Sequence, residues 1–321
     1  MVNETVLSAK LDQLTRLVLG VLQHQQRTDT LMHLQAKTLI AQRRARGILQ
    51  SIHDAEFTVY SQFGDDGIIQ YLVDNIAIPE TSKCFVEFGV ENYTQSNTRF
   101  LLFNNNWTGL VMDGSPQNVA YIQQDVLLNW RHHITAQAAF ITRENINDLI
   151  RQGGINGEIG LLSVDIDGND YWVLEAIDVV KPLILVSEYN SLFGKDRALT
   201  IPYDPAFVRT NAHYSNLYFG CSLKALCHVA DKKGYAFVGC NSQGINAYFV
   251  RKDALGALKT VSPEEGYVAS MIRESKNQQG ALTFVAGIDR LRLIQDLPLY
   301  DIQSDSTAPI KDLFASELGY A

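Results

Sequence analysis

Hydrophobic positions at the start of the chain recur at the spacing of an α-helix. Between Val6 and Ile52 the sequence has no proline and only two glycines, which favours a helix throughout. Apolar residues at positions 7, 11, 14, 18 and 21 follow a four-three spacing that lines one face. Beyond Val21 that face carries Gln25 and Thr28. We expect residues 1–55 to be a helical extension through which chains form a homo-oligomer, although so few heptads also fit a helix packed on its own chain.

After this extension the pattern changes to short apolar runs separated by stretches of helical periodicity. Such alternation is typical of a parallel sheet with helices on both faces, so residues 56–252 predict a Rossmann-like α/β domain. A closing hairpin follows the last helix, and residues 253–321 form a C-terminal extension with a helix near 263–276. The seven predicted strands are residues 83–89, 108–114, 133–141, 160–166, 182–189, 235–240 and 245–251.

The composition narrows the class of protein. Apolar residues make up 46% of the chain and charged residues 19%, which is typical of a globular protein. The net charge of -8 provides no basic surface for nucleic acid, so we expect a small-molecule or glycan acceptor instead. We also expect a cytoplasmic protein without a transmembrane segment, because no apolar run reaches membrane-spanning length. The four cysteines form no CxxC pair, which argues against a zinc site.

The carboxyl ends of the first two predicted strands carry the residues expected of a cofactor site. Ligands of open α/β sheets bind at this edge. The first strand ends in Glu87 and Gly89, and a glycine lets the backbone approach a ligand closely. The second strand ends in Asp113, whose carboxylate could accept both ribose hydroxyls of a nucleotide. The alternative is that Gly89 only makes a turn and Asp113 only caps the next helix.

Four segments at these strand ends resemble a known family. They are EFGV at 87–90, SNT at 96–98, WTGLVMDG at 107–114 and DIDGND at 165–170. Over roughly residues 60–251 the chain is similar to FkbM-type S-adenosylmethionine-dependent methyltransferases. The resemblance implies a seven-stranded class I methyltransferase sheet and O-methylation of a sugar hydroxyl in a polysaccharide, glycolipid or secondary metabolite. The chain departs from the usual glycine-rich loop, because VENYTQ follows the first strand.

The same resemblance implies which residues bind S-adenosylmethionine. Glu87 and Gly89 would face its methionine portion, and Asp113 its ribose. Gln62 and Asp65 precede the first strand and would close over the cofactor, unless Asp65 only caps a helix. With Ala139 and Phe140 at the adenine edge, the predicted set is Gln62, Asp65, Glu87, Gly89, Asn97, Thr98, Asp113, Gly114, Ala139, Phe140 and Asp165.

Acidic side chains gather at the ends of the fourth and fifth predicted strands. Asp165, Asp167 and Asp170 follow one strand, and Glu188 and Asn190 end the next. Converging carboxylates repel each other unless they share a proton or a cation. We therefore expect a divalent cation such as Mg²⁺ at Asp165, Asp167, Glu188 and Asn190, where it would lower the pKa of an acceptor hydroxyl. Without a metal, Asp165 would bind the cofactor amine, Asp170 would cap a helix and Glu188 would form a salt bridge.

The long connection over residues 191–220 predicts a functional lid. Its aromatic and basic side chains suit a sugar, including one that bears a phosphate or carboxylate, although many of the aromatics could simply anchor the loop. His213 is the only histidine of the loop, so we expect it to act as the general base, with Asp167 as the second catalytic residue. The predicted substrate-binding residues are Asp170, Tyr189, Arg197, Tyr203, Arg209 and Tyr214.

Other classes of protein fit the sequence less well. A haloacid dehalogenase-type phosphohydrolase would use Asp165 as nucleophile and Asp167 as general acid, but its motif normally opens the domain. A nicotinamide-dependent oxidoreductase would need G-x-G-x-x-G after the first strand, which is absent. A non-catalytic Rossmann-like assembly protein stays an alternative.

Overall fold

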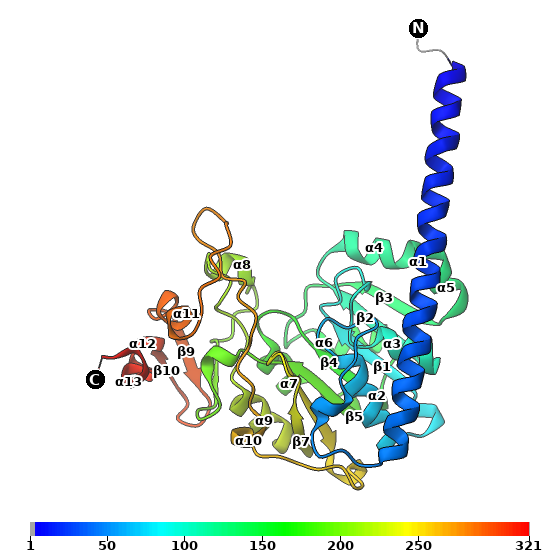
Figure 1. Cartoon of the computed structure of the whole chain (residues 1–321). Helices are drawn as coiled ribbons and strands as arrows, with labels where there is room; N and C mark the ends of the chain where they lie inside the picture. Colours follow the sequence, from blue (N-terminus) through cyan, green and yellow to red (C-terminus); the bar gives the residue numbers. More distant parts are fainter. Residues whose placement is uncertain (1–3, 321) are drawn as a thin grey trace. The chain divides into compact units, whose positions relative to one another are not determined.

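The computed structural model describes residues 4–320, which divide into two compact units on either side of Gly47. The first is one long helix, α1 (Glu4–Arg46) (Figure 1). Its last turn carries Arg43, Arg44 and Arg46, and the helix dipole stabilises positive charges at this end. Its predicted apolar face is open to solvent, since the side chains at positions 7, 11, 14, 18 and 21 are 50 to 66% exposed. Within residues 4–320, no helix is both long enough and apolar enough to cross a membrane.

The second unit is built on a seven-stranded sheet in the order β3-β2-β1-β4-β5-β8-β7. The first five strands are parallel, and β8 runs antiparallel to both β5 and β7. This is the predicted seven-stranded Rossmann-like sheet of class I methyltransferases, with the closing hairpin at its edge. The strands are β1 (Cys84–Phe88), β2 (Thr108–Asp113), β3 (Ile134–Ala138), β4 (Gly157–Val164), β5 (Val180–Glu188), β7 (Tyr235–Cys240) and β8 (Asn246–Arg251).

Helices cover both faces of this sheet because successive strand residues point to opposite sides. Val86 and Leu110 pack on one face with α6, α7 and α9, whereas Phe85 and Val111 pack on the other with α2 and α3. The α/β prediction is confirmed. The helices are α2 (Asp65–Asn75), α3 (Arg99–Asn105), α4 (Pro116–Gln124), α5 (Val126–Arg131), α6 (Ile146–Gln152), α7 (Asp170–Ala176) and α9 (Leu223–Lys232).

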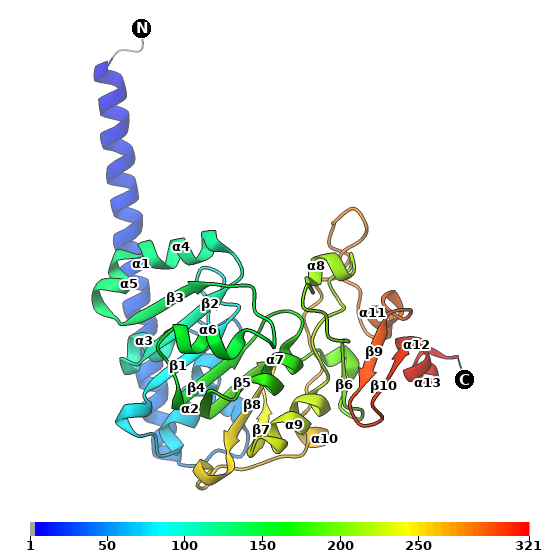
Figure 2. The ribbon, with the colours of Figure 1, turned by 180° about the vertical axis from the view of Figure 1, so that it is seen from behind.

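A small second sheet joins the long 191–220 connection to the C-terminal extension. Its strand order is β10-β9-β6. The sheet, the connection and the C-terminal helices pack around a separate apolar core that includes Leu199, Leu217 and Leu299. This sheet and α11 to α13 lie on the far side of the unit from β3 in both views (Figures 1 and 2). The elements are β6 (Leu199–Thr200), α8 (Arg209–Ala212), α11 (Ile288–Leu293), β9 (Pro298–Asp301), β10 (Ser306–Pro309), α12 (Ile310–Leu313) and α13 (Ala315–Leu318).

The helix predicted over residues 263–276 is wrong beyond its first turn. A capping box at Ser262 starts α10 (Pro263–Gly266), but the chain then continues without helical structure. The side chain of Tyr189 donates to the Val268 carbonyl at 2.5 Å, and Tyr267 donates to the Ser191 carbonyl at 2.8 Å. These tertiary bonds hold the segment along the 191–220 connection, so they override its local helical preference.

Candidate functional site

A cavity of about 440 Å³ lies at the carboxyl ends of β1, β2, β4 and β5. This is the edge of the sheet at which open α/β folds bind ligands. Every predicted cofactor residue except Thr98 lies in its wall. The predicted Asp167, Glu188 and Arg209 also line it, and so does Glu274 from the C-terminal extension. One cavity therefore joins the predicted cofactor end to the acidic acceptor end.

Gly89 is required where β1 leaves the sheet. Its backbone has φ of +68°, and a Cβ atom added there would lie 1.7 Å from the carbonyl oxygen of Asp165. Only glycine tolerates both the left-handed conformation and this approach of two backbones. The ends of β1 and β4 are thus brought into contact at the floor of the cavity.

Glu87 is a buried carboxylate that organises the turn after β1. It accepts hydrogen bonds from the Ser96 hydroxyl at 2.9 Å, from the backbone N–H of Asn97 at 2.8 Å and from that of Thr98 at 3.1 Å. The Thr98 hydroxyl donates to it as well. Burial raises the pKa of Glu87, and these donors oppose the rise. Thr98 therefore lies behind the cavity wall as a partner of Glu87.

Asp113 holds the loop that replaces a glycine-rich turn. Its Oδ2 accepts from the Glu91 N–H at 2.8 Å, and its Oδ1 accepts from the Ser115 N–H at 2.8 Å and the Asn118 amide at 3.0 Å. Both interpretations of Asp113 from the sequence are therefore compatible. It shapes the start of α4, and a carboxylate with about four acceptor positions keeps capacity for a ligand hydroxyl.

The segment before β1 is fastened to β8 through Asp65. Its Oδ1 accepts from the amides of Asn241 at 2.9 Å and Asn246 at 3.1 Å, and from the Tyr248 hydroxyl. Next to it, Oδ2 of Asp66 accepts three backbone N–H groups of residues 59–61 at 2.6 to 2.9 Å. These bonds position Gln62 and Asp65 in the cavity wall.

Three carboxylates converge at the acceptor end. One oxygen from each of Asp165, Asp167 and Glu188 lies within 4.8 Å of the others. Burial and the neighbouring negative charges raise the pKa of Asp165 and of Glu188 well above their ordinary values. Within residues 4–320, Oε2 of Glu188 finds no hydrogen-bond partner. The cluster can accept a proton or hold a cation.

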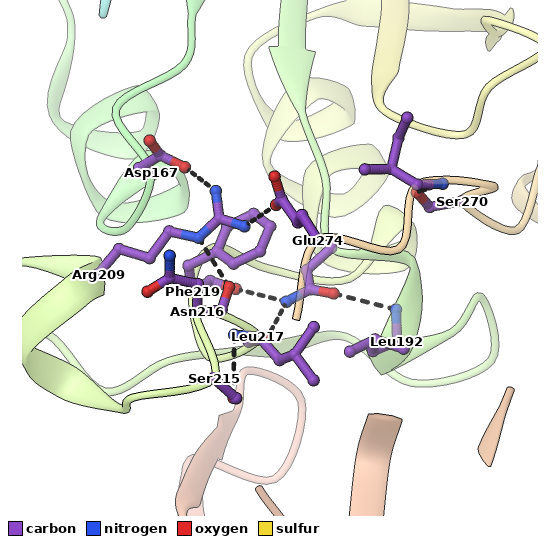
Figure 3. Close-up of polar contacts among 11 residues, drawn as sticks. Asp167, Leu192, Arg209, Ser215, Asn216, Leu217, Phe219, Ser270 and Glu274 are labelled. Atoms are coloured by element: carbon purple, nitrogen blue, oxygen red, sulfur yellow. Dashed lines mark hydrogen bonds and ion pairs between the residues drawn. The ribbon is translucent and has the colours of Figure 1, made fainter. Parts of the chain in front are cut away.

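Arg209 is the basic residue of this cavity wall, and its guanidinium contacts protein on several sides (Figure 3). It bonds to the carboxylates of Asp167 and Glu274, and its Nε donates to the Asn216 carbonyl at 2.8 Å. The guanidinium carbon of Arg209 lies 3.7 Å from the centroid of the Phe219 ring, over its face. Arg209 thus ties the loop after β4 to the C-terminal extension.

Asp170 does not line the cavity, contrary to its predicted role in substrate binding. It is buried, and it accepts the backbone N–H groups of Ile166 at 2.8 Å and Gly168 at 2.9 Å. Burial raises its pKa to about 6. These bonds close the turn that places Asp167 at φ of +55°. Asp170 is itself the first residue of α7, and its side chain bonds to the turn before the helix, so it makes no cap bond to α7.

Asn190 and His213 are also absent from the cavity wall. The Asn190 amide donates to the carbonyls of Leu217 and Phe219 at 3.0 Å each, and its oxygen accepts from the Leu192 N–H. All its polar atoms are therefore used to fasten the 191–220 connection, which corrects its assignment as a metal ligand.

His213 instead pairs with its own loop. Its Nδ1 lies 2.7 Å from the Ser215 hydroxyl, and its ring stacks near that of Tyr214 at 4.2 Å. Burial lowers the pKa of His213. Because it lies outside the cavity wall, the expectation that His213 is the general base is corrected.

The other predicted substrate residues serve the architecture around the cavity. The Tyr189 hydroxyl bonds to the C-terminal extension, Arg197 donates to the Leu313 carbonyl, and Tyr203 bonds to Glu144. Tyr214 is partly exposed beside His213 and does not line the cavity. The wall residues that the sequence reasoning missed include Asn169, Phe207, Asn246, Ile272 and Glu274. Asn169 was detectable within DIDGND, whereas Ile272 and Glu274 belong to no motif.

Comparisons with known proteins give matches among solved structures only. No protein-family description matches, and no curated protein matches. An S-adenosylmethionine-dependent methyltransferase from Clostridium acetobutylicum is 11% identical, with a TM-score of 0.36, over 58% of this chain and 89% of that chain. A second, from Aquifex aeolicus, is 10% identical with a TM-score of 0.36, over 59% and 90%.

A third neighbour is an O-methyltransferase from neocarzinostatin biosynthesis, solved with S-adenosylmethionine and 2-hydroxy-5-methyl naphthoic acid. It is 12% identical with a TM-score of 0.33, over 53% of this chain and 49% of that chain. At such low identities and TM-scores these neighbours assign no residue and no activity here. The class I methyltransferase fold therefore rests on the strand order itself, and the FkbM-type resemblance stays a prediction from the motifs.

Proposed function

We propose that the protein is an S-adenosylmethionine-dependent O-methyltransferase that acts on a sugar hydroxyl. The observation that carries this proposal is the single cavity at the strand ends. Asp113 stands at the end of β2, Gly89 at the end of β1, and the cluster of carboxylates at the ends of β4 and β5. Methyl transfer needs both parts, because cofactor and acceptor must meet in line. The strand order with antiparallel β8 supports the same class.

The reaction is a displacement at the methyl carbon. The acceptor oxygen forms a bond to that carbon, the carbon–sulfur bond breaks, and the sulfur keeps the electron pair and becomes neutral. The hydroxyl proton passes to a carboxylate. Asp165 and Glu188 suit this step better than Asp167, because their raised pKa values make them stronger bases and Arg209 already engages Asp167.

A divalent cation such as Mg²⁺ fits the same three carboxylates. Asp165, Asp167 and Glu188 offer the oxygen ligands that hard cations prefer, and Oε2 of Glu188 has no partner among the described residues. When bound, such a cation would lower the pKa of an acceptor hydroxyl. Asn190 is no longer part of this proposed set.

Calorimetric titration tests the class of enzyme directly. The chelator-treated chain is titrated with S-adenosylmethionine and S-adenosylhomocysteine, with and without Mg²⁺. We expect binding of both, and an Mg²⁺ heat that disappears in Glu188→Gln. Absence of heat with either ligand, together with binding of a nicotinamide dinucleotide, would contradict the proposal.

Two matched aspartates separate the cofactor end from the acceptor end. Asp113→Asn should weaken S-adenosylhomocysteine binding about tenfold or more, because a charged hydrogen-bond acceptor is lost. Asp167→Asn should change that affinity less than about twofold, since the Asp167 side chain is 56% exposed and its ion-pair partner is Arg209. Equal losses would contradict this division of the cavity.

A further inference from the structure

The polar atoms left without a partner in the cavity wall are of one kind. Within residues 4–320, Oε2 of Glu188, Oδ1 of Asn169 and Oδ1 of Asn246 are buried wall atoms without a hydrogen bond. The orientations of the two amides follow from their partners. Nδ2 of Asn169 donates to the Asp204 carbonyl, and Nδ2 of Asn246 donates to the Asp65 carboxylate, so each Oδ1 is the unpaired atom. All three unpaired atoms are therefore acceptors, and a ligand that satisfies them must bring N–H or O–H groups.

The charges of the cavity wall also favour a ligand that brings hydrogen-bond donors or positive charge. At the acceptor end, Asp165, Asp167, Glu188 and Glu274 face one basic side chain, Arg209, which is the only Lys, Arg or His among the cavity-lining residues described. Each of its three nitrogens already donates to the protein. The guanidinium thus pairs with two wall carboxylates, whose combined negative charge exceeds its own, and presents no unopposed positive charge to a ligand.

This arrangement overturns the sequence expectation that basic loop residues receive a phosphate or carboxylate. Arg197 is bonded to the Leu313 carbonyl, and Arg209 lies between Asp167 and Glu274. We propose, resting on the function proposed above, that the acceptor is a neutral or positively charged molecule rich in hydroxyl or amino groups. Phosphorylated and carboxylated acceptors are excluded.

Coulomb's law indicates how strong this selection is. Like charges a few ångströms apart repel each other much more strongly inside a protein cavity than in bulk water. An anionic group in this part of the cavity is repelled by every wall carboxylate that is ionised. It meets one attraction, that of Arg209, which Asp167 and Glu274 already share. A divalent cation at the cluster would at most offset the net charge, so the site would not become positive in either state. The exclusion of anions therefore holds with and without metal.

Four probes with the same ring and different charge test the inference. They are glucose, glucosamine, glucose 6-phosphate and glucuronic acid, titrated into the full chain saturated with S-adenosylhomocysteine and followed by saturation-transfer NMR, with Mg²⁺ or with chelator. We expect glucose and glucosamine to bind at least about tenfold more tightly than the two anions in both conditions. Equal binding by all four, binding by none, or tighter binding of an anion overturns the inference.

A charge variant ties the preference to this wall. Glu274→Gln removes one negative charge beside Arg209, so the preference over glucose 6-phosphate should shrink several-fold. Glu317→Gln removes the same charge from an exposed helix outside the cavity and should leave it unchanged. An unaltered preference in Glu274→Gln places its cause elsewhere and overturns the inference. The two proposals fail separately, since loss of S-adenosylhomocysteine binding refutes the enzyme class, whereas normal binding with the wrong order of probes refutes only the acceptor class.

Discussion

The two ends of the cavity treat their carboxylates in opposite ways. At the cofactor end, Glu87 and Asp113 accept several hydrogen bonds each from the loops that they organise. At the acceptor end, Asp165 and Glu188 lie near other carboxylates, and one oxygen of Glu188 has no partner among the described residues. Carboxylates whose oxygens all accept hydrogen bonds stabilise the loops around them, whereas carboxylates with unpaired oxygens keep their capacity for a proton or a ligand. Removing a charge should therefore cost stability at one end and activity at the other.

The largest effect on stability is expected from Gly89→Ala. The added methyl group meets the Asp165 carbonyl at 1.7 Å, so the ends of β1 and β4 must separate. The free energy of unfolding should fall by about 3 kcal/mol or more, measured by urea denaturation. Gly114→Ala is the matched control, because nothing lies within 4 Å of its Cβ, and it should cost less than about 1 kcal/mol. Similar losses in both variants would contradict the close contact.

A pair of glutamates tests the comparison itself. Glu87→Gln turns one acceptor oxygen into a donor that faces the backbone N–H group of Asn97 or Thr98, so we expect a loss of about 1–3 kcal/mol and weaker cofactor binding. Glu188→Gln removes a repulsive charge, so stability should stay within about 1 kcal/mol of wild type or rise, while methyl transfer is lost. Urea denaturation and a transfer assay measure both. A large stability loss in Glu188→Gln would remove the distinction between the two ends.

A pH dependence should come from Asp66, below the cofactor end. Burial raises its pKa from 3.8 to about 7 in the folded chain. The protonated carboxyl therefore contributes stability that is fully present below about pH 4 and is lost as the pH rises through about 7. The unfolding free energy of wild type should therefore fall relative to that of Asp66→Asn between about pH 5 and 8, and the difference should then level off. A constant difference across that range would show that Asp66 keeps an ordinary pKa.

The smallest effect on the cavity is expected from α1. Leu11→Ser with Leu14→Ser places polar groups on its exposed apolar face. If chains associate through this face, the sedimentation-equilibrium mass should fall toward that of one chain, while S-adenosylhomocysteine affinity stays within about twofold. Thr15→Ser is a control with little change in polarity. An unchanged mass would refute association through this face.

Much of the sheet was predictable because its signals are local. Phe85 and Val86 pack into two different apolar layers, and a strand buried on both faces appears in the sequence as a short apolar run. Gly89 and Asp113 were found for the same reason, since they directly follow buried strands. The residues that line the cavity at the ends of β1 and β2 could therefore be predicted from the sequence.

The acceptor end depends on contacts between segments far apart in sequence. Asn190 looked like a ligand because it follows β5, but its partners lie in the chain 27 and 29 residues later. His213 was chosen by residue type alone, and no local pattern indicated that its loop carries it away from the cavity. Glu274 lies in a segment whose helical pattern is overridden by tertiary bonds. Only the three-dimensional structure brings it to Arg209.

The pairing of β6 with β9 gives the cavity an order of completion during synthesis. Leu199 and Thr200 pair with Asp301 and Tyr300, about a hundred residues further along the chain. A ribosome finishes every strand of the main sheet by Arg251, before any of β9 has been made. The wall residues Ile272 and Glu274 are likewise made only after the sheet that carries the rest of the cavity wall. The last part of the protein to be translated thus completes a cavity whose other walls the sheet has already formed.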